Sequence, residues 1–150
     1  MTRLRARYRT KRGTAAVEFA LVAPLLLLLL GGLIQFGWAV WCDSALNGAV
    51  SQASYYAFMA GPNVSTAAIV TMAEQASALG GITATASAPA CYCASGTPAA
   101  PSPAASCTTN CADGSKPGVY TTIAADYTVP RFLPLFAAPQ LSETATVRIK

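Results

Sequence analysis

An acidic side chain at the edge of a long apolar run is the first residue of this sequence that could do chemistry. Glu18 lies five residues after Gly13 and directly before the uncharged stretch that begins at Phe19. A carboxylate in such a place is costly in lipid unless it is paired. The helix dipole favours an acid at this end, but a capping box would put it three residues after Thr14, and Glu18 comes four residues after it. Glu18 therefore calls for a positive partner.

Cysteines form the second reactive group, and four of the five lie in one stretch. These four allow three pairings. A bridge between Cys91 and Cys93 would be strained, so we favour two crosslinks that join this pair to Cys107 and Cys111, in an order that stays open. A four-thiolate zinc site is the alternative, because Cys-x-Cys followed by Cys-x-x-x-Cys is close to metal spacing. An exported, oxidising location favours disulfides. Cys42 stands apart, as a buried apolar residue or an intermolecular partner.

Catalytic groups of the common kinds are missing. The sequence has no histidine, which removes the usual general base and the Ser-His and Cys-His nucleophile pairs. No glycine loop that could cradle a phosphate occurs. The acids beyond Glu18 are scattered singly, as solvated surface charges are: Asp43, Glu74, Asp113, Asp126 and Glu143. We therefore predict a protein that is not an enzyme, with no cofactor and no metal site.

A stretch without formal charge runs from Phe19 to Cys42. As a helix, its 24 residues extend about 36 Å, enough to cross a hydrocarbon core of about 30 Å. The apolar region of an ordinary secretory signal peptide is much shorter. Phe36, Trp38 and Trp41 fit an aromatic belt at the far interface. These features predict a helix that spans the membrane.

Basic residues are concentrated at the N-terminus. Six of the ten lie before Gly13, and the rest of the chain has four basic and six acidic residues, a balance of −2. Positive charge beside a membrane span keeps that end in the cytoplasm. We therefore expect a cytoplasmic N-terminus and an extracytoplasmic C-terminal domain. The overall basic composition gives no argument for a nucleic-acid partner, and we predict none.

The segment from Arg12 to Pro24 reads Arg-Gly-Thr-Ala-Ala-Val-Glu-Phe-Ala-Leu-Val-Ala-Pro. It resembles the processing site of type IV pilin-like proteins, and its wording resembles the TadE-like minor pseudopilins of the tight-adherence (Flp) pilus system. The resemblance covers residues 12 to about 60. It implies that a prepilin peptidase cuts between Gly13 and Thr14. It also implies that Glu18 pairs with the new Thr14 ammonium in its own or a neighbouring subunit, which removes the penalty of two isolated charges.

The same resemblance implies partners and a location. The partners would be the prepilin peptidase, other pilins or pseudopilins, the pilus assembly platform of the inner membrane, and membrane lipid. The chain would cross the cytoplasmic membrane once and associate with the pilus after processing. Two alternatives stay open. One is a pseudopilin of a type II secretion or DNA-uptake machine, and the other is a signal-anchored exported protein whose disulfide-tied loop binds a ligand or surface.

The helical pattern continues beyond the membrane segment as an amphipathic stem. Its apolar positions keep a three-four spacing: Leu46, Ala49, Val50, Ala53, Ala57 and Ala60. Gly61 and Pro62 end it. A short second helix is predicted at 65–79, before Gly80 and Gly81. We accordingly divide the chain into a basic leader at 1–13, a transmembrane and stem helix at 14–60, and a small domain at 61–150.

The rest of the sequence predicts an α+β fold with a small antiparallel sheet of about three strands. Period-two alternation or β-favouring residues place these strands at 82–87, 119–129 and 143–150. Residues 88–118 are rich in Pro, Ala, Ser and Thr and are predicted to form a long loop that the disulfides hold. Before the last strand, a Pro-rich crossing carries apolar side chains that we expect to cover the sheet or form a contact surface: Phe132, Leu133, Leu135 and Phe136.

Overall fold

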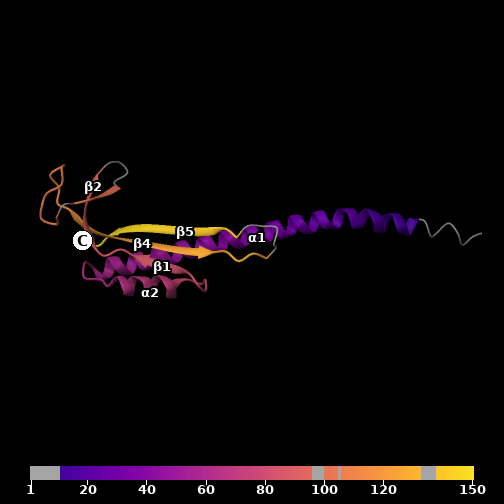
Figure 1. The fold of residues 1–150 in the computed structure, drawn as a ribbon, viewed down its shortest axis with the longest axis horizontal. Coiled ribbons are helices and arrows are strands. Elements are labelled where there is room, and N and C mark those ends of the chain that lie inside the picture. Colours follow the sequence, from indigo (N-terminus) through magenta and orange to yellow (C-terminus); the bar gives the residue numbers. More distant parts are fainter. Residues whose placement is uncertain (1–10, 96–99, 105, 133–137) are drawn as a thin grey trace, which may run out of the picture.

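The computed structural model describes residues 11–95, 100–104, 106–132 and 138–150. Helix α1 (Lys11–Ala60) is followed by helix α2 (Thr66–Ala76) and by strands β1 (Thr83–Ala86), β2 (Ala90–Ser95), β3 (Ala100–Pro103), β4 (Gly118–Thr128) and β5 (Gln140–Arg148). Figure 1 shows that α1 projects from a small domain in which α2 and the sheet lie beside its C-terminal half. The predicted α+β class, with a long first helix and a short second one, is confirmed.

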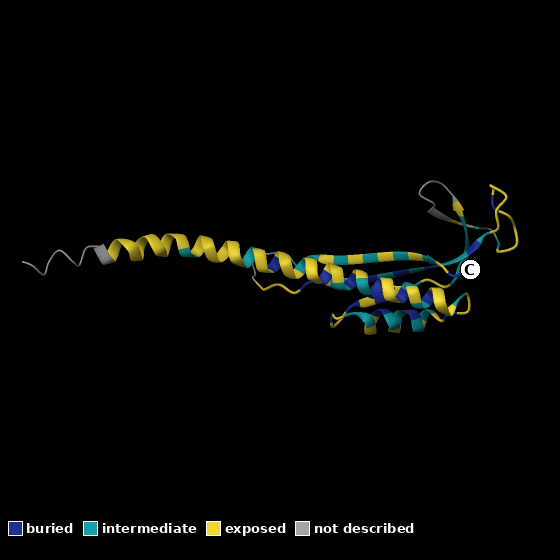
Figure 2. Cartoon of the chain, turned by 180° about the vertical axis from the view of Figure 1, so that it is seen from behind, coloured by how far each residue is buried: buried dark blue, intermediate teal, exposed yellow. Residues whose placement is uncertain are grey.

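Helix α1 is 50 residues long, which corresponds to about 75 Å. Its N-terminal half is exposed, whereas its C-terminal half has one buried stripe (Figure 2). The buried side chains repeat every three or four residues and include Cys42, Leu46, Ala49, Val50, Ala53 and Ala57. The predicted stem face is therefore confirmed, except that Ala60 is exposed at the helix end. Gly61 ends the helix with φ +75°, and its N–H donates to the Ala57 carbonyl at 3.1 Å.

The core of the domain lies between α1, α2 and one face of the sheet. Alanines dominate the buried stripe of α1, so α2 and the strands approach its backbone closely. Ile69 and Ala73 of α2 and Ile123 and Ala125 of β4 are fully buried in this layer. Helix α2 is shorter than predicted because Ser77 leaves the helical conformation, with ψ 131°.

Strand β4 is the centre of the antiparallel sheet. Ile123 pairs with Ala86 of β1 and with Ala145 of β5, so β4 lies between these two strands. Strand β2 pairs with the start of β4, and β3 pairs with β2 at the edge. In β5 the alternation of half-buried and exposed residues follows the predicted pattern. The three predicted strands are thus present, with small shifts in their bounds.

The segment predicted as one long loop contains two further strands, β2 and β3. The composition of this segment does not predict them, because proline residues such as Pro101 and Pro103 are uncommon in strands. Proline is tolerated on an edge strand, and β3 pairs on one side only. In the Pro-rich crossing before β5, Phe132 is described and is 56% exposed. The predicted roles of Leu133, Leu135 and Phe136 fall outside the described residues.

Candidate functional site

Most of the large hydrophobic side chains that are exposed in the described part of the chain lie on residues 13–34 of α1, which we call its apolar half. Its side chains project without cover, with Phe19 74% and Leu21 75% exposed. Length and composition suit this helix to cross a membrane, and none of its most apolar window is buried in the fold. The helix is therefore compatible with a membrane anchor.

The predicted processing site lies on this same helix. Gly13 and Thr14 are helical and exposed, and a Cβ added at Gly13 would meet nothing within 4 Å. Glu18 is also exposed, one turn beyond Thr14. Because residues four apart share a helix face, the backbone nitrogen of Thr14 and the carboxylate of Glu18 lie on one side of α1. The two residues that the sequence singles out thus lie on one face of the helix, and their pairing stays a prediction.

Gln35 is a residue that the sequence analysis missed. It is only 7% exposed, although it lies in the uncharged run. Its Nε2 donates to the Pro130 carbonyl at 3.2 Å, and its Oε1 accepts from the Phe132 N–H at 3.1 Å. These bonds join the helix to the end of β4. An isolated amide in an apolar run indicates that a polar partner exists. The sequence does not identify that partner, because Pro130 and Phe132 lie 95 and 97 positions away.

The four loop cysteines form two crosslinks at the end of the domain far from the apolar half of α1 (Figure 1). Cys91 is bonded to Cys107, with Cα atoms 5.3 Å apart, and Cys93 is bonded to Cys111, with Cα atoms 5.7 Å apart. Each crosslink ties β2 to the segment before β4. This leaves no thiolate of the four for the zinc alternative. Cys42 is a free thiol and is fully buried against the sheet side of α1.

A tight turn lies between the second crosslink and β4. Asp113 Oδ1 accepts from the Ser115 hydroxyl at 2.7 Å and from the Ser115 N–H at 2.9 Å. These hydrogen bonds lower the pKa of the Asp113 carboxyl below its usual value. The Cys111 N–H also donates to the Ser115 carbonyl at 2.8 Å. Asp113 therefore stabilises this turn.

The cysteine assignment predicts a simple labelling result. Alkylation of the purified chain in denaturant, without reductant, should label Cys42 alone, because the other four sulfurs are bonded. Reductant should raise the count to all five cysteines. The Cys42→Ala variant is the matched control and should show no labelling before reduction. Four additional labelled thiols in the non-reduced chain, with bound zinc, would contradict the crosslinks.

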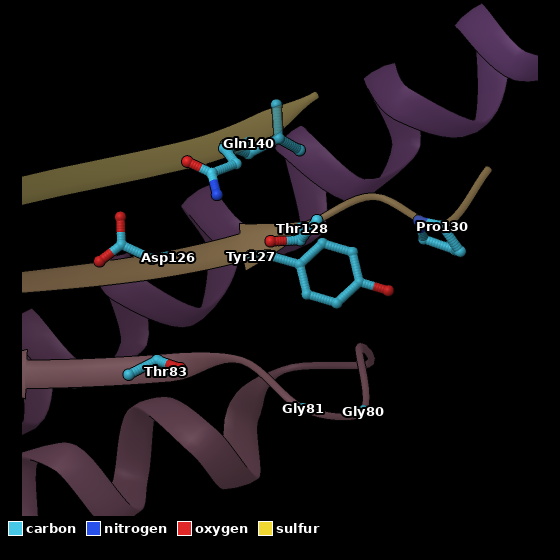
Figure 3. Close-up of a pocket in the computed structure, with 9 residues that line it drawn as sticks. Gly80, Gly81, Thr83, Asp126, Tyr127, Thr128, Pro130 and Gln140 are labelled. Atoms are coloured by element: carbon cyan, nitrogen blue, oxygen red, sulfur yellow. The ribbon is translucent and has the colours of Figure 1, made fainter. Parts of the chain in front are cut away.

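An open polar depression of about 520 Å³ lies where β1, β4 and β5 approach the Gly80–Gly81 turn. Figure 3 shows Asp126 and Gln140 at its rim, on neighbouring strands, and Tyr127 extending beside the turn. Asp126 pairs in register with Thr83, so its neighbour is a hydroxyl. A single exposed carboxylate without a second acid or base supports no acid–base pair. Within the described ranges no three side chains are grouped as metal ligands.

Residues 13–54 match the model of the protein family described as TadE-like protein. The matched segment begins at Gly13 and covers the apolar half of α1 and most of its buried stripe. No curated protein and no solved structure matches the chain. The chain is thus similar to TadE-like proteins over residues 13–54.

Proposed function

We propose that this protein is a minor pilin or pseudopilin that a prepilin peptidase cuts after Gly13 and that takes part in assembly of a tight-adherence pilus. The carrying observation is a coincidence of positions. The TadE-like match begins at Gly13, and Thr14 and Glu18 follow this residue just before the uncharged run of α1. The proposed role is not enzymatic and requires no cofactor.

Gly13 supports the processing step because its fold does not need a glycine there. The residue is helical, and a side chain would meet nothing within 4 Å. Glycine in a helix interior costs about 1 kcal/mol relative to alanine. The same property makes the helix easier to open at this point, and a peptidase must bring the backbone close to its own groups. The helix therefore does not require a glycine at this position, whereas contact between a peptidase and the backbone favours one.

Glu18 supports the assembly step. After cleavage, Thr14 would carry an ammonium group at the start of the helix, one turn from the Glu18 carboxylate. Both positions are exposed on the apolar half of α1, where a neighbouring subunit would pack. Lipid penalises each charge separately, and pairing within or between subunits offsets that penalty. The proposed partners are accordingly other pilin-like helices and the assembly platform of the inner membrane.

The proposed location is the cytoplasmic membrane, with one crossing, the N-terminus in the cytoplasm and residues 61–150 outside. The basic residues before Gly13 favour this orientation. Both disulfides lie in the part of the chain that would be exported. Disulfides persist in oxidising compartments and are rare in the cytosol, so their position agrees with the orientation.

The test is deletion of this protein from cells that make tight-adherence pili. Loss of surface pili, restored by the intact chain, is the expected result, and unchanged piliation in the deletion strain would refute a role in assembly. The orientation is measured in the same strain with a second copy of the chain. This copy is fused after Lys150 to a reporter that is active only outside the cytoplasm. An active reporter is expected, and a silent but stable fusion would contradict the topology.

A further inference from the structure

We propose that the domain lies directly on the outer surface of the bilayer, through a contact formed by Trp38 and Trp41 of α1 and by residues 130–132, which follow β4. We call these residues the interfacial patch. Its partner is the headgroup and glycerol region of the outer leaflet. The inference rests on the proposed membrane insertion of α1. It adds that a segment from the C-terminal half of the chain also enters the interface.

Gln35 fixes the depth of the patch. If the Thr14 ammonium that the proposed cleavage creates lies at the inner edge of the hydrocarbon core, the 21 residues from Thr14 to Ile34 extend about 31 Å and cross a core of about 30 Å. Gln35 therefore lies where the hydrocarbon ends. Its amide bonds the Pro130 carbonyl and the Phe132 N–H, so residues 130–132 are held at the same level. Figure 1 shows that β4 ends on the side of the domain that faces the apolar half of α1.

The two hydrogen bonds also explain how the amide and the loop tolerate this position. An unpaired amide near hydrocarbon is strongly unfavourable, because no water is present to replace its hydrogen bonds. Each polar atom of the Gln35 side chain has a backbone partner, and the side chain is 7% exposed. Two backbone groups of the loop are satisfied in return. The loop can therefore approach the bilayer without exposing unpaired groups there.

The side chains of the patch have the chemistry of a membrane interface. The Trp38 ring contacts the Trp41 ring at a tilt of 36°, with centroids 4.8 Å apart, and meets Phe132 edge-on at 5.8 Å. All three remain open, with 37%, 46% and 56% of their surfaces exposed respectively. Tryptophan favours the headgroup level. The adjacent Arg131 is exposed and can bind lipid phosphate.

The interfacial patch is continuous with the apolar half of α1, and this continuity favours the bilayer as its partner. The patch joins the apolar half of α1 without a break, and that half is open in the fold. Whatever solvent surrounds the helix up to Ile34 must also reach the aromatic rings in the next turn. A membrane around the helix therefore meets the patch, whereas a protein partner would have to displace lipid from it.

Depth-dependent fluorescence quenching tests this seating. The full-length chain, with Cys42→Ala, is reconstituted in vesicles of phosphatidylcholine and phosphatidylglycerol that contain a headgroup nitroxide lipid. One fluorophore is attached at Phe132→Cys, at Leu30→Cys in the apolar half, or at Lys116→Cys before β4. We expect the label at 132 to lose most of its fluorescence to the headgroup nitroxide and the label at 116 to lose almost none. The label at 30 should respond to a nitroxide placed deep in the acyl chain.

The control at position 30 separates the two proposals. No deep quenching at 30 would show that α1 is not inserted, which would refute the anchor and the patch together. Deep quenching at 30 without quenching at 132 would refute the patch alone, and a blue-shifted but unquenched label at 132 would assign its cover to protein.

Gln35→Leu tests the role of the amide. This variant should abolish most of the quenching at 132 and leave position 30 inserted. Gln52→Leu, an exposed glutamine on the same helix, is the matched control and should leave both labels unchanged. Undiminished quenching at 132 in Gln35→Leu would overturn the proposal that Gln35 holds the loop at the interface.

Discussion

Replacing Gly13 with leucine should leave the basic leader on the membrane form of the protein. The expected cause is steric, because the peptidase must contact the backbone at a position where a branched side chain would obstruct it. The fold itself should not change, since a Cβ at Gly13 meets nothing within 4 Å. Mass measurement of the purified chain should show the leader retained in nearly all molecules, and surface pili should be lost.

Gly37→Leu is the matched control for this experiment. Gly37 is a glycine of the same helix with the same open space around a Cβ. Its substitution should leave Thr14 as the first residue, as in the unaltered chain. A Gly13→Leu protein that also begins at Thr14 would show that the glycine is not required for cutting. Cleavage at a different bond in the unaltered chain would refute the proposed site.

Replacing Glu18 with alanine should give a protein that is cut and inserted but does not support piliation. The carboxylate is proposed to pair with the Thr14 ammonium after cleavage, so the peptidase should still act. Removal of one partner of a buried pair typically costs about 3–5 kcal/mol. A loss of that size is enough to prevent docking between helices. The measurements are the N-terminal residue, the amount of protein in the membrane, and the number of surface pili.

Glu74→Ala controls for the loss of a negative charge. Glu74 is exposed on α2, away from the apolar half of α1, and its variant should be piliated normally. Normal piliation with Glu18→Ala, in cells that lose pili when the protein is deleted, would refute the pairing and return Glu18 to the helix-dipole role. Failure of cleavage in Glu18→Ala would instead show that the peptidase reads this acid.

The sequence predicts those features that depend on local pattern. The three-four spacing from Leu46 to Ala57 identifies the buried face of α1, and period two identifies β5. Gly61 marks the helix end because its left-handed φ suits glycine. The crosslinking of the cysteines is predicted from their exported location, where disulfides persist.

Features that depend on distant partners could not be predicted. Strand β3 contains prolines and is visible only through its pairing with β2. The order of the disulfides follows from how β2 is placed against the segment before β4. The role of Gln35 is set by Pro130 and Phe132, whose position relative to α1 depends on the whole sheet. No local period carries that information.

Helix α1 is one uninterrupted rod that serves both the apolar half and the core of the domain. Pro24, the one proline within it, lies in the apolar half, so no hinge separates Gln35 from Ala57. Rotation of the rod by one residue position, about 100°, turns the sheet through the same angle. Contacts that fix which face of the apolar half is covered therefore also fix the direction, around the axis of α1, in which the disulfide-tied end of the domain points.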